Sequence, residues 1–247
     1  VEQPWLWPVV AALARRPGQA KFVTIYGSQN IEAPLKQEIF QQMGIKNGDE
    51  LVERVAALEV QAAREADVTL AVSQQDANEI EKWGPKRIEL ALNGIKPWSP
   101  PDNAKRKQWT DRLPKFPWLL YIASAHPPNF SHFAEIFGGS LACVPPYSRI
   151  VVAGSVSEHI YQTMVTSDWA SINLSRLELL FVLPDEDLDA LKSLAHGFIL
   201  PIGFGGGTNI KTAEAIYSGA HIVATPAAFR GYEEFLDFPE ISIGCDT

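Results

Sequence analysis

The sequence predicts an α/β protein of two Rossmann-like domains with parallel sheets, the first domain incomplete. Strand-like and helix-like segments alternate along the 247 residues. The strand-like segments are short, nearly continuous apolar runs, which is typical of a parallel sheet covered on both faces. A proline-rich stretch interrupts this alternation. We therefore expect a partial first domain over 1–97, a linker over 98–116 and a second domain over 117–247.

In the first domain, apolar residues at helical spacing separate the strand patterns. Leu51, Val55, Leu58 and Ala62 mark the longest helix, and Gly84-Pro85 ends the last one. Three strands are too few for an independent sheet of this class, so the domain is expected to be incomplete. The expected strands are 21–26, 67–72 and 87–92, and the expected helices are 31–43, 49–66 and 73–83.

Between residues 96 and 117, prolines alternate with Lys and Arg and the apolar periodicity disappears, which predicts a linker. Strands and helices then alternate in a doubly wound order of five or six strands. The expected strands are 118–123, 149–153, 177–182, 197–202, 221–224 and 241–244, and the expected helices are 130–138, 156–164, 185–195 and 209–218.

Composition narrows the function classes. The formal net charge is −8, which disfavours nonspecific binding to nucleic acid. Cys143 and Cys245 lie in no metal-ligand spacing, so we expect neither a zinc site nor a disulfide framework. No apolar run reaches the length of a membrane span, and the N-terminus lacks a signal-peptide pattern. We expect a cytoplasmic protein, soluble or peripherally attached.

The segment from Pro201 to Gly219 carries the clearest functional pattern: a strand end, a run of glycines and an amphipathic helix. Glycines allow the backbone to approach a phosphate, and the start of a helix favours an anion. Lys211 adds a positive charge, and Glu214 can accept hydrogen bonds from sugar or ribose hydroxyls. A simple tight turn remains an alternative. The residues expected at this site are Gly205, Gly206, Gly207, Thr208, Asn209, Lys211 and Glu214.

Spacing separates this segment from two other phosphate-binding loops. The dinucleotide fingerprint needs a glycine at position 208, where Thr208 stands. The P-loop needs Gly-Lys-Ser/Thr, which is absent here. The loop therefore predicts neither an NAD-binding domain nor a P-loop enzyme.

Four motifs, in the expected order, resemble those of retaining glycosyltransferases of the GT-B type, the glycosyl transferases group 1 family. Residues 205–214 with 217–225 resemble its donor-site signature, whose last glutamate binds the donor ribose. Ala-Ser-Ala-His-Pro-Pro-Asn at 123–129 is similar to the segment that starts the donor domain in one branch. Leu-Asn-Gly-Ile at 92–95 resembles the hinge, and 26–32 resembles the acceptor-domain loop that usually carries His-Asn-x-Glu.

The chain departs from this family in two ways. Members commonly carry two glutamates eight positions apart at the donor site, and Gly206 stands at the first position here. The resemblance also implies an N-terminal half-domain with its own glycine loop, which these residues do not contain. We therefore expect a fragment of the enzyme whose two ends are cut, and whether it is active alone stays open.

The resemblance implies a hexosyltransferase-type enzyme. It would move a sugar from a nucleotide-diphosphate donor to a glycan or lipid-linked acceptor with retention, in polysaccharide biosynthesis. This would happen at the inner face of the membrane, with peripheral attachment through the missing N-terminal part. Neither a cofactor nor a metal is expected, and neither is nucleic acid as a partner. The acceptor hydroxyl would attack on the same face that the diphosphate leaves, so no protein nucleophile is needed.

The same resemblance gives roles to individual residues. Lys211 and His126 are the expected catalytic residues, and Lys211 with the N–H groups of 206–209 would stabilise the departing diphosphate. His126 would bind the donor's sugar or phosphate, or serve only as a local hydrogen-bonding residue, and Asn129 is expected to cap a helix beginning at Phe130. Asn30 and Glu32 would lie on the acceptor side or cap the helix after them. Arg230-Gly231-Tyr232 would close over the nucleotide.

Two other functions stay open. A nucleotide-sugar 2-epimerase of the same fold would need an acid/base set around the sugar, and no paired carboxylates lie near the glycine loop. A non-catalytic module that binds a nucleotide sugar or a glycan would keep the fold without turnover, which the absence of the first glutamate favours. Turnover with an acceptor separates the transferase from both.

Overall fold

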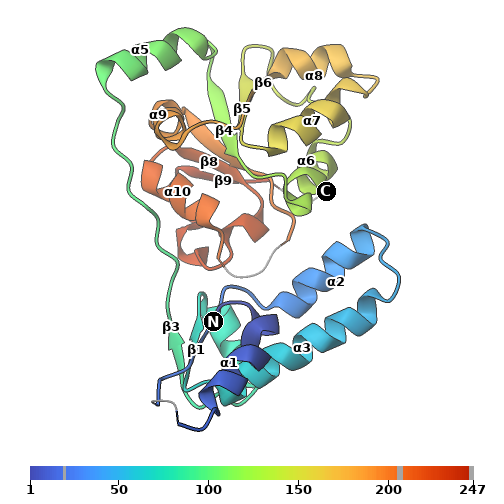
Figure 1. Ribbon diagram of the computed structural model, residues 1–247. Coiled ribbons are helices and arrows are strands. Elements are labelled where there is room, and N and C mark those ends of the chain that lie inside the picture. Colours follow the sequence, from blue (N-terminus) through green and yellow to red (C-terminus); the bar gives the residue numbers. More distant parts are fainter. Residues whose placement is uncertain (19–20, 205–207, 245–247) are drawn as a thin grey trace. The chain divides into compact units, whose positions relative to one another are not determined.

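The computed structural model describes residues 1–18, 21–204 and 208–244, and the chain divides into two compact units. The first contains Val1–Gly94, and the second contains Ile95–Phe204 and the residues from Asn209 onwards. Each unit is built on one sheet whose paired strands are all parallel. Figure 1 shows both sheets with their helices. The α/β class with two parallel sheets is therefore confirmed.

The first unit has a three-stranded sheet in the order β1-β2-β3. Alanines at 62, 63 and 66 let the longest helix pack closely on this sheet, around Tyr26 and Ile80. Its strands are β1 (Ile25–Ser28), β2 (Val68–Ala71) and β3 (Ile88–Leu90), and its helices are the 3-10 helix η1 (Pro4–Leu6), α1 (Trp7–Ala14), α2 (Glu32–Gln42), α3 (Gly48–Glu65) and α4 (Gln74–Glu81).

Strand β1 begins at Ile25, four residues later than the apolar run predicts. The backbone N–H and the hydroxyl of Thr24 both donate to the Asp67 carboxylate at 2.9 Å. Thr24 therefore contacts the segment that leads into β2 through the Asp67 side chain as well as through the backbone, just before the ladder starts at the Ile25–Val68 pair. Phe22 and Val23 are exposed. An apolar run shows which residues can form a strand, but the register of the partner decides where it starts.

The second unit has a six-stranded sheet in the order β6-β5-β4-β7-β8-β9, which confirms the expected doubly wound sheet. The chain moves outward from β4 in one direction, returns across the sheet, and continues outward from β7 in the other. The topological switch point thus lies between β4 and β7. The strands are β4 (Trp118–Ile122), β5 (Arg149–Ala153), β6 (Leu177–Phe181), β7 (Gly197–Leu200), β8 (His221–Ala224) and β9 (Ile241–Ile243).

Helices cover this sheet on two faces, with α6, α7 and α8 on one and α9 and α10 on the other (Figure 1). Each face has its own apolar core. None of the helices in the described ranges is long and apolar enough to cross a membrane. The helices are α6 (Pro127–Phe137), α7 (Val156–Val165), α8 (Ala170–Arg176), α9 (Asp185–Leu194) and α10 (Ile210–Ser218), with the 3-10 helices η2 (Pro226–Phe229) and η3 (Glu233–Phe235).

Residues 98–116, expected to be a linker, contain a helix, α5 (Asn103–Arg112). The Asp102 carboxylate caps it by accepting from Lys105 N at 2.8 Å. Trp109 is buried in the core of the second unit, and its indole N–H donates to the Asp187 carboxylate of α9 at 2.9 Å. The sequence did not predict this helix, because only Trp109 and Leu113 of an otherwise polar segment are buried, and two residues show no helical period. It belongs to the second unit.

Of the two cysteines, Cys143 is exposed, and Cys245 lies outside the described residues. The absence of a disulfide framework therefore stays a prediction.

Candidate functional site

The loops after β4 and β7 flank the switch point of the second sheet, where ligands bind in open parallel sheets. The first loop carries the His126 motif, and the second carries the glycine run. Gly205, Gly206 and Gly207, the expected phosphate-binding residues, lie outside the described residues. The described residues of the candidate site are those on either side of this run, up to Phe204 and from Thr208.

Asn209 begins α10 as its N-cap. Its side-chain oxygen accepts from Lys211 N at 3.2 Å, and its backbone oxygen accepts from Thr212 N at 2.9 Å. The Thr212 hydroxyl donates to Ala228 O, which ties the first turn of α10 to η2. The positive end of α10 is thereby fixed at the carboxyl end of the sheet, the position in which a helix favours an anion. Asn209, expected to bind the donor, shapes this helix start.

Lys211 reaches across the switch point. Its ammonium donates to the Asn129 amide oxygen at 3.0 Å, so the start of α10 and the first turn of α6 are joined by a side-chain hydrogen bond. Burial lowers the pKa of Lys211, and the nearby Glu214 carboxylate opposes that shift. A half-buried ammonium whose hydrogen-bond partner is a neutral amide keeps its charge available for an anion, and a bound anion would restore its pKa.

The expectation that Asn129 caps a helix starting at Phe130 is wrong. Helix α6 starts at Pro127, with His126 as its N-cap, because two prolines suit a first turn whose N–H groups have no helical partner. The Asn129 amide instead donates to Ser124 O at 2.9 Å while its oxygen accepts from Lys211. Asn129 therefore orients Lys211, a role that spacing along the chain did not reveal.

His126, the second expected catalytic residue, has an exposed side chain after β4. Its backbone carbonyl accepts from Asn129 N at 2.9 Å, and its ring makes no helix-capping hydrogen bond. His126 thus precedes the first turn of α6, which carries the Asn129 side chain that Lys211 contacts. Donor contact by its ring stays a prediction.

Glu214 lies one turn after Lys211 on α10. Its carboxylate forms an ion pair with Lys192 of α9, at 2.6 Å between Oε1 and Nζ. Lys192 was not singled out from the sequence, since nothing in its spacing relates it to the glycine loop. The carboxylate expected to bind the ribose thus stands between two lysines.

Thr208, the remaining loop residue, is counted with the first unit. Its hydroxyl accepts from the Asn93 side-chain amide at 2.8 Å. Asn93 belongs to the 92–95 motif expected to be the hinge. The donor role predicted for Thr208 remains a prediction.

Asn30 and Glu32 are the residues expected on the acceptor side. Asn30 lies between β1 and α2 of the first unit, and Glu32 is the first residue of α2. The Asn30 amide donates to Glu32 Oε1 at 2.9 Å, and Lys36 stands 3.4 Å from Glu32 Oε2. The N–H groups of Glu32 and Ala33 donate to the buried Glu59 carboxylate. These contacts show a structural role in the turn, and acceptor binding stays a prediction.

The Arg230-Gly231-Tyr232 segment follows η2. The Tyr232 ring packs against the apolar core of the second unit, and Gly231 N donates to the Glu233 carboxylate at 2.9 Å. Closure of this segment over a nucleotide stays a prediction.

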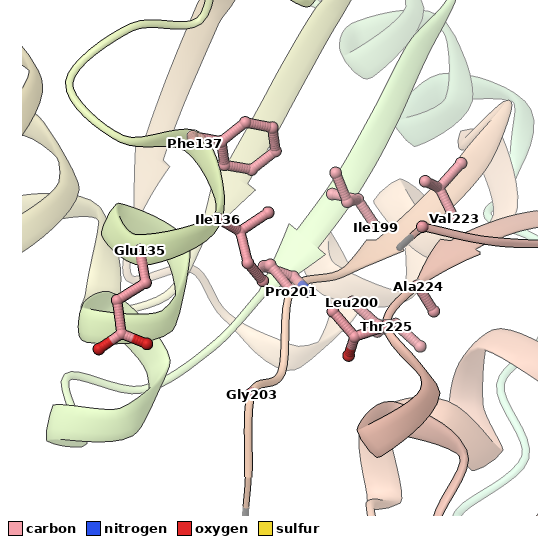
Figure 2. A pocket seen from close by; sticks show the side chains of 11 residues that line it. Glu135, Ile136, Phe137, Ile199, Leu200, Pro201, Gly203, Val223, Ala224 and Thr225 are labelled. Atoms are coloured by element: carbon pink, nitrogen blue, oxygen red, sulfur yellow. The ribbon is translucent and has the colours of Figure 1, made fainter. Parts of the chain in front are cut away.

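A separate cavity of about 420 Å³ lies between α6 and the ends of β7 and β8 (Figure 2). Ile136, Ile199 and Val223 line it, and Figure 2 shows the Glu135 carboxylate directed away from them. Neither Lys211 nor Glu214 belongs to this lining. The cavity is therefore mainly apolar, and the charged groups suited to a diphosphate lie outside it.

No family model matches the chain, and no curated protein sequence matches it. Several solved structures are similar to the chain. The structure of Anabaena HepE in complex with UDP and glucose is 15% identical in sequence, with a TM-score of 0.69, over 98% of this chain and 62% of that one. Sucrose-phosphate synthase from Thermosynechococcus elongatus is 14% identical with a TM-score of 0.67, over 95% and 55%. WaaG, a glycosyltransferase involved in lipopolysaccharide biosynthesis, is 16% identical with a TM-score of 0.65, over 97% and 67%.

At these identities the likeness shows the fold. The chain has the GT-B fold of these glycosyltransferases, as the four motifs predicted. It spans 62% of the length of HepE and 55% of that of the synthase, so activities of those whole proteins do not transfer by likeness alone.

Proposed function

We propose that this chain is the donor-binding part of a retaining glycosyltransferase of the hexosyltransferase type. The observation that carries this proposal is the meeting of Lys211 and Asn129 across the switch point, beside the N-terminus of α10. A cation, held by the Asn129 amide oxygen, and a helix start converge there on the ligand position of an open parallel sheet. A nucleoside diphosphate has the charge and shape that such a set of groups binds.

The proposed chemistry requires stabilisation of a leaving diphosphate. As the bond from the sugar to the diphosphate breaks, negative charge grows on the phosphate oxygens, and Lys211 with the first N–H groups of α10 would stabilise it. The acceptor hydroxyl would attack from the face the diphosphate leaves, which retains the sugar's configuration. No protein nucleophile and no metal ion are needed in this scheme.

The donor is proposed to be a UDP-sugar, with Glu214 accepting a hydrogen bond from the ribose. HepE, which shares the fold, was crystallised with UDP and with UDP-glucose, and this supports the choice of base. The acceptor is proposed to be a glycan or lipid-linked sugar, used in polysaccharide assembly at the cytoplasmic face of a membrane. WaaG, which shares the fold, is involved in lipopolysaccharide biosynthesis, and this supports the choice of polysaccharide assembly.

Calorimetric titration of the purified chain with UDP, GDP, UDP-glucose, GDP-mannose and NAD tests the donor site. We expect a UDP compound to bind, and Lys211→Met to weaken that binding at least tenfold, because a charge-assisted hydrogen bond is worth about 1.5–3 kcal/mol. Lys107→Met is the matched control, because the Lys107 side chain is exposed on α5 and paired only with Asp111 within the described residues.

The control variant should bind as tightly as the wild type. Binding of NAD alone, or equal losses in both variants, would refute the proposal. Release of free UDP together with an epimerised sugar, in the absence of acceptor, would point to the 2-epimerase instead.

A further inference from the structure

Lys192 and Glu214 form an ion pair that is largely hidden from water. The side chain of Lys192 is 11% exposed and that of Glu214 is 24% exposed, with 2.6 Å between the charged atoms. Asp189, on the same helix as Lys192, is more distant at 3.8 Å. Glu214 is therefore the main partner of Lys192, and the low exposure strengthens their attraction relative to a surface pair.

The Trp98 ring packs against the Lys192 end of this ion pair. The Lys192 ammonium lies 4.9 Å from the centre of the Trp98 ring, a cation–π distance. Trp98 in turn meets Tyr217 edge to face, with 4.6 Å between ring centres. Tyr217 is three residues after Glu214 on α10, so the partner of Trp98 and the partner of Lys192 belong to the same helix. Lys192 is thereby held in one position, between a carboxylate and an indole face.

The charges of two residues of α10 and one of α9 alternate as a result. Lys211 and Lys192 are positive, and Glu214, which interacts with both, is negative and opposes the burial that lowers the pKa of Lys211. Without Lys192, Glu214 would cancel the charge that Lys211 offers to a diphosphate. With Lys192 paired to Oε1, the three groups keep one net positive charge. In the described part of the chain, Oε2 of Glu214 accepts no hydrogen bond from a side chain or backbone group that would block a ribose hydroxyl.

We propose that Lys192 is a positioning residue of the donor site, which fixes Glu214 for ribose recognition and keeps the site positive for the diphosphate. This inference rests on the proposed function. Lys192 does not touch the donor in this scheme and acts through Glu214.

The test compares UDP with 2′-deoxy-UDP and 3′-deoxy-UDP, and GDP with its deoxy forms, by calorimetry on the full chain. A carboxylate that accepts from a ribose hydroxyl should make the wild type prefer the ribonucleotide by about tenfold or more over one deoxy form. We expect Lys192→Met to reduce this preference below about threefold and Glu214→Ala, which lacks an acceptor, to remove it, while Lys192→Arg, which keeps the charge, retains it.

Lys105→Met is the matched control. Lys105 forms a comparable pair with Asp187, at 2.9 Å and with 27% of its side chain exposed, between α5 and α9 of the same unit. This variant should keep the full preference for the ribonucleotide. A preference that stays intact in Lys192→Met, or a loss of affinity that is equal for ribo- and deoxynucleotides, would overturn the role of Lys192 and leave the proposed function standing. A wild type that binds neither UDP nor GDP would overturn both.

Discussion

A buried carboxylate holds the first turn of helix α2. The oxygens of Glu59, which lies on α3, accept from Glu32 N at 2.6 Å and from Ala33 N at 3.0 Å. The helix needs this cap from elsewhere, because its own N-cap residue, Ile31, has no side-chain acceptor. Burial raises the pKa of Glu59 to about 7, and the neighbouring Glu32 and Asp76 carboxylates act in the same direction.

This pKa predicts a pH-dependent stability. A carboxyl whose pKa is about 7 when folded and 4.5 otherwise binds more protons in the folded state between these values. Its stabilising contribution is therefore complete below about pH 4.5 and lost as the pH rises to about 7, at up to ~1.4 kcal/mol per pH unit. We expect chemical denaturation at pH 5, 6, 7 and 8 to show the first unit weakening with rising pH.

Glu59→Gln should flatten that pH dependence, because its amide does not titrate. Glu89→Gln serves as the control, since Glu89 is half exposed on β3 and pairs with Arg87. If the wild type and Glu59→Gln lost stability equally between pH 5 and pH 8, Glu59 would not be the group responsible.

At the residue scale, the sequence could predict those site residues that lie close together along the chain. Lys211 and Glu214 could be found because they follow a strand end and glycines on one helix. Asn129 and Lys192 could not, because each is defined by a partner distant in the chain, 82 residues away for Asn129 and 22 for Lys192. Their roles arise only from the packing of α6 against α10 and of α9 against α10.

At the element scale, the packing of helix α5 on the second unit predicts how much stability that unit loses without Trp109. Trp109 is 1% exposed and joins α5 to α9, so Trp109→Ala should destabilise the second unit by about 3–5 kcal/mol. Trp169 is 54% exposed in the same unit, and Trp169→Ala should change stability by no more than about 0.5 kcal/mol. Urea unfolding followed by circular dichroism measures both. A loss below about 1 kcal/mol for Trp109→Ala would show that α5 is not part of the core.

Strands were easier to predict from the sequence than short or mainly polar helices such as α5 and α8. The expected ranges 149–153 and 221–224 coincide with β5 and β8. Strand β5 buries all its side chains except that of Arg149, and β8 buries Ile222 and Ala224, so that both strands contain apolar runs. Helix α8 was not predicted, since its seven residues are too few to show a helical period. Helix α5 was missed for a related reason, a nearly polar surface with one anchoring pair.

At the scale of the whole molecule, the two units differ in how much of a core they contain. The six-stranded sheet has a core on each face. The first unit has three strands, and Trp5, Leu6, Val9 and Leu13 are exposed there, while Trp7 and Ala11 are buried in its core. Sequence alone could predict this asymmetry by counting strands.

A crystal structure of the chain with UDP tests the central claim most directly. We predict the diphosphate within hydrogen-bonding distance of the Lys211 ammonium at the start of α10, with a ribose hydroxyl on the Glu214 carboxylate and the Lys192–Glu214 pair intact. UDP seated in the apolar cavity beside Ile136 and Val223, away from Lys211, would contradict the account.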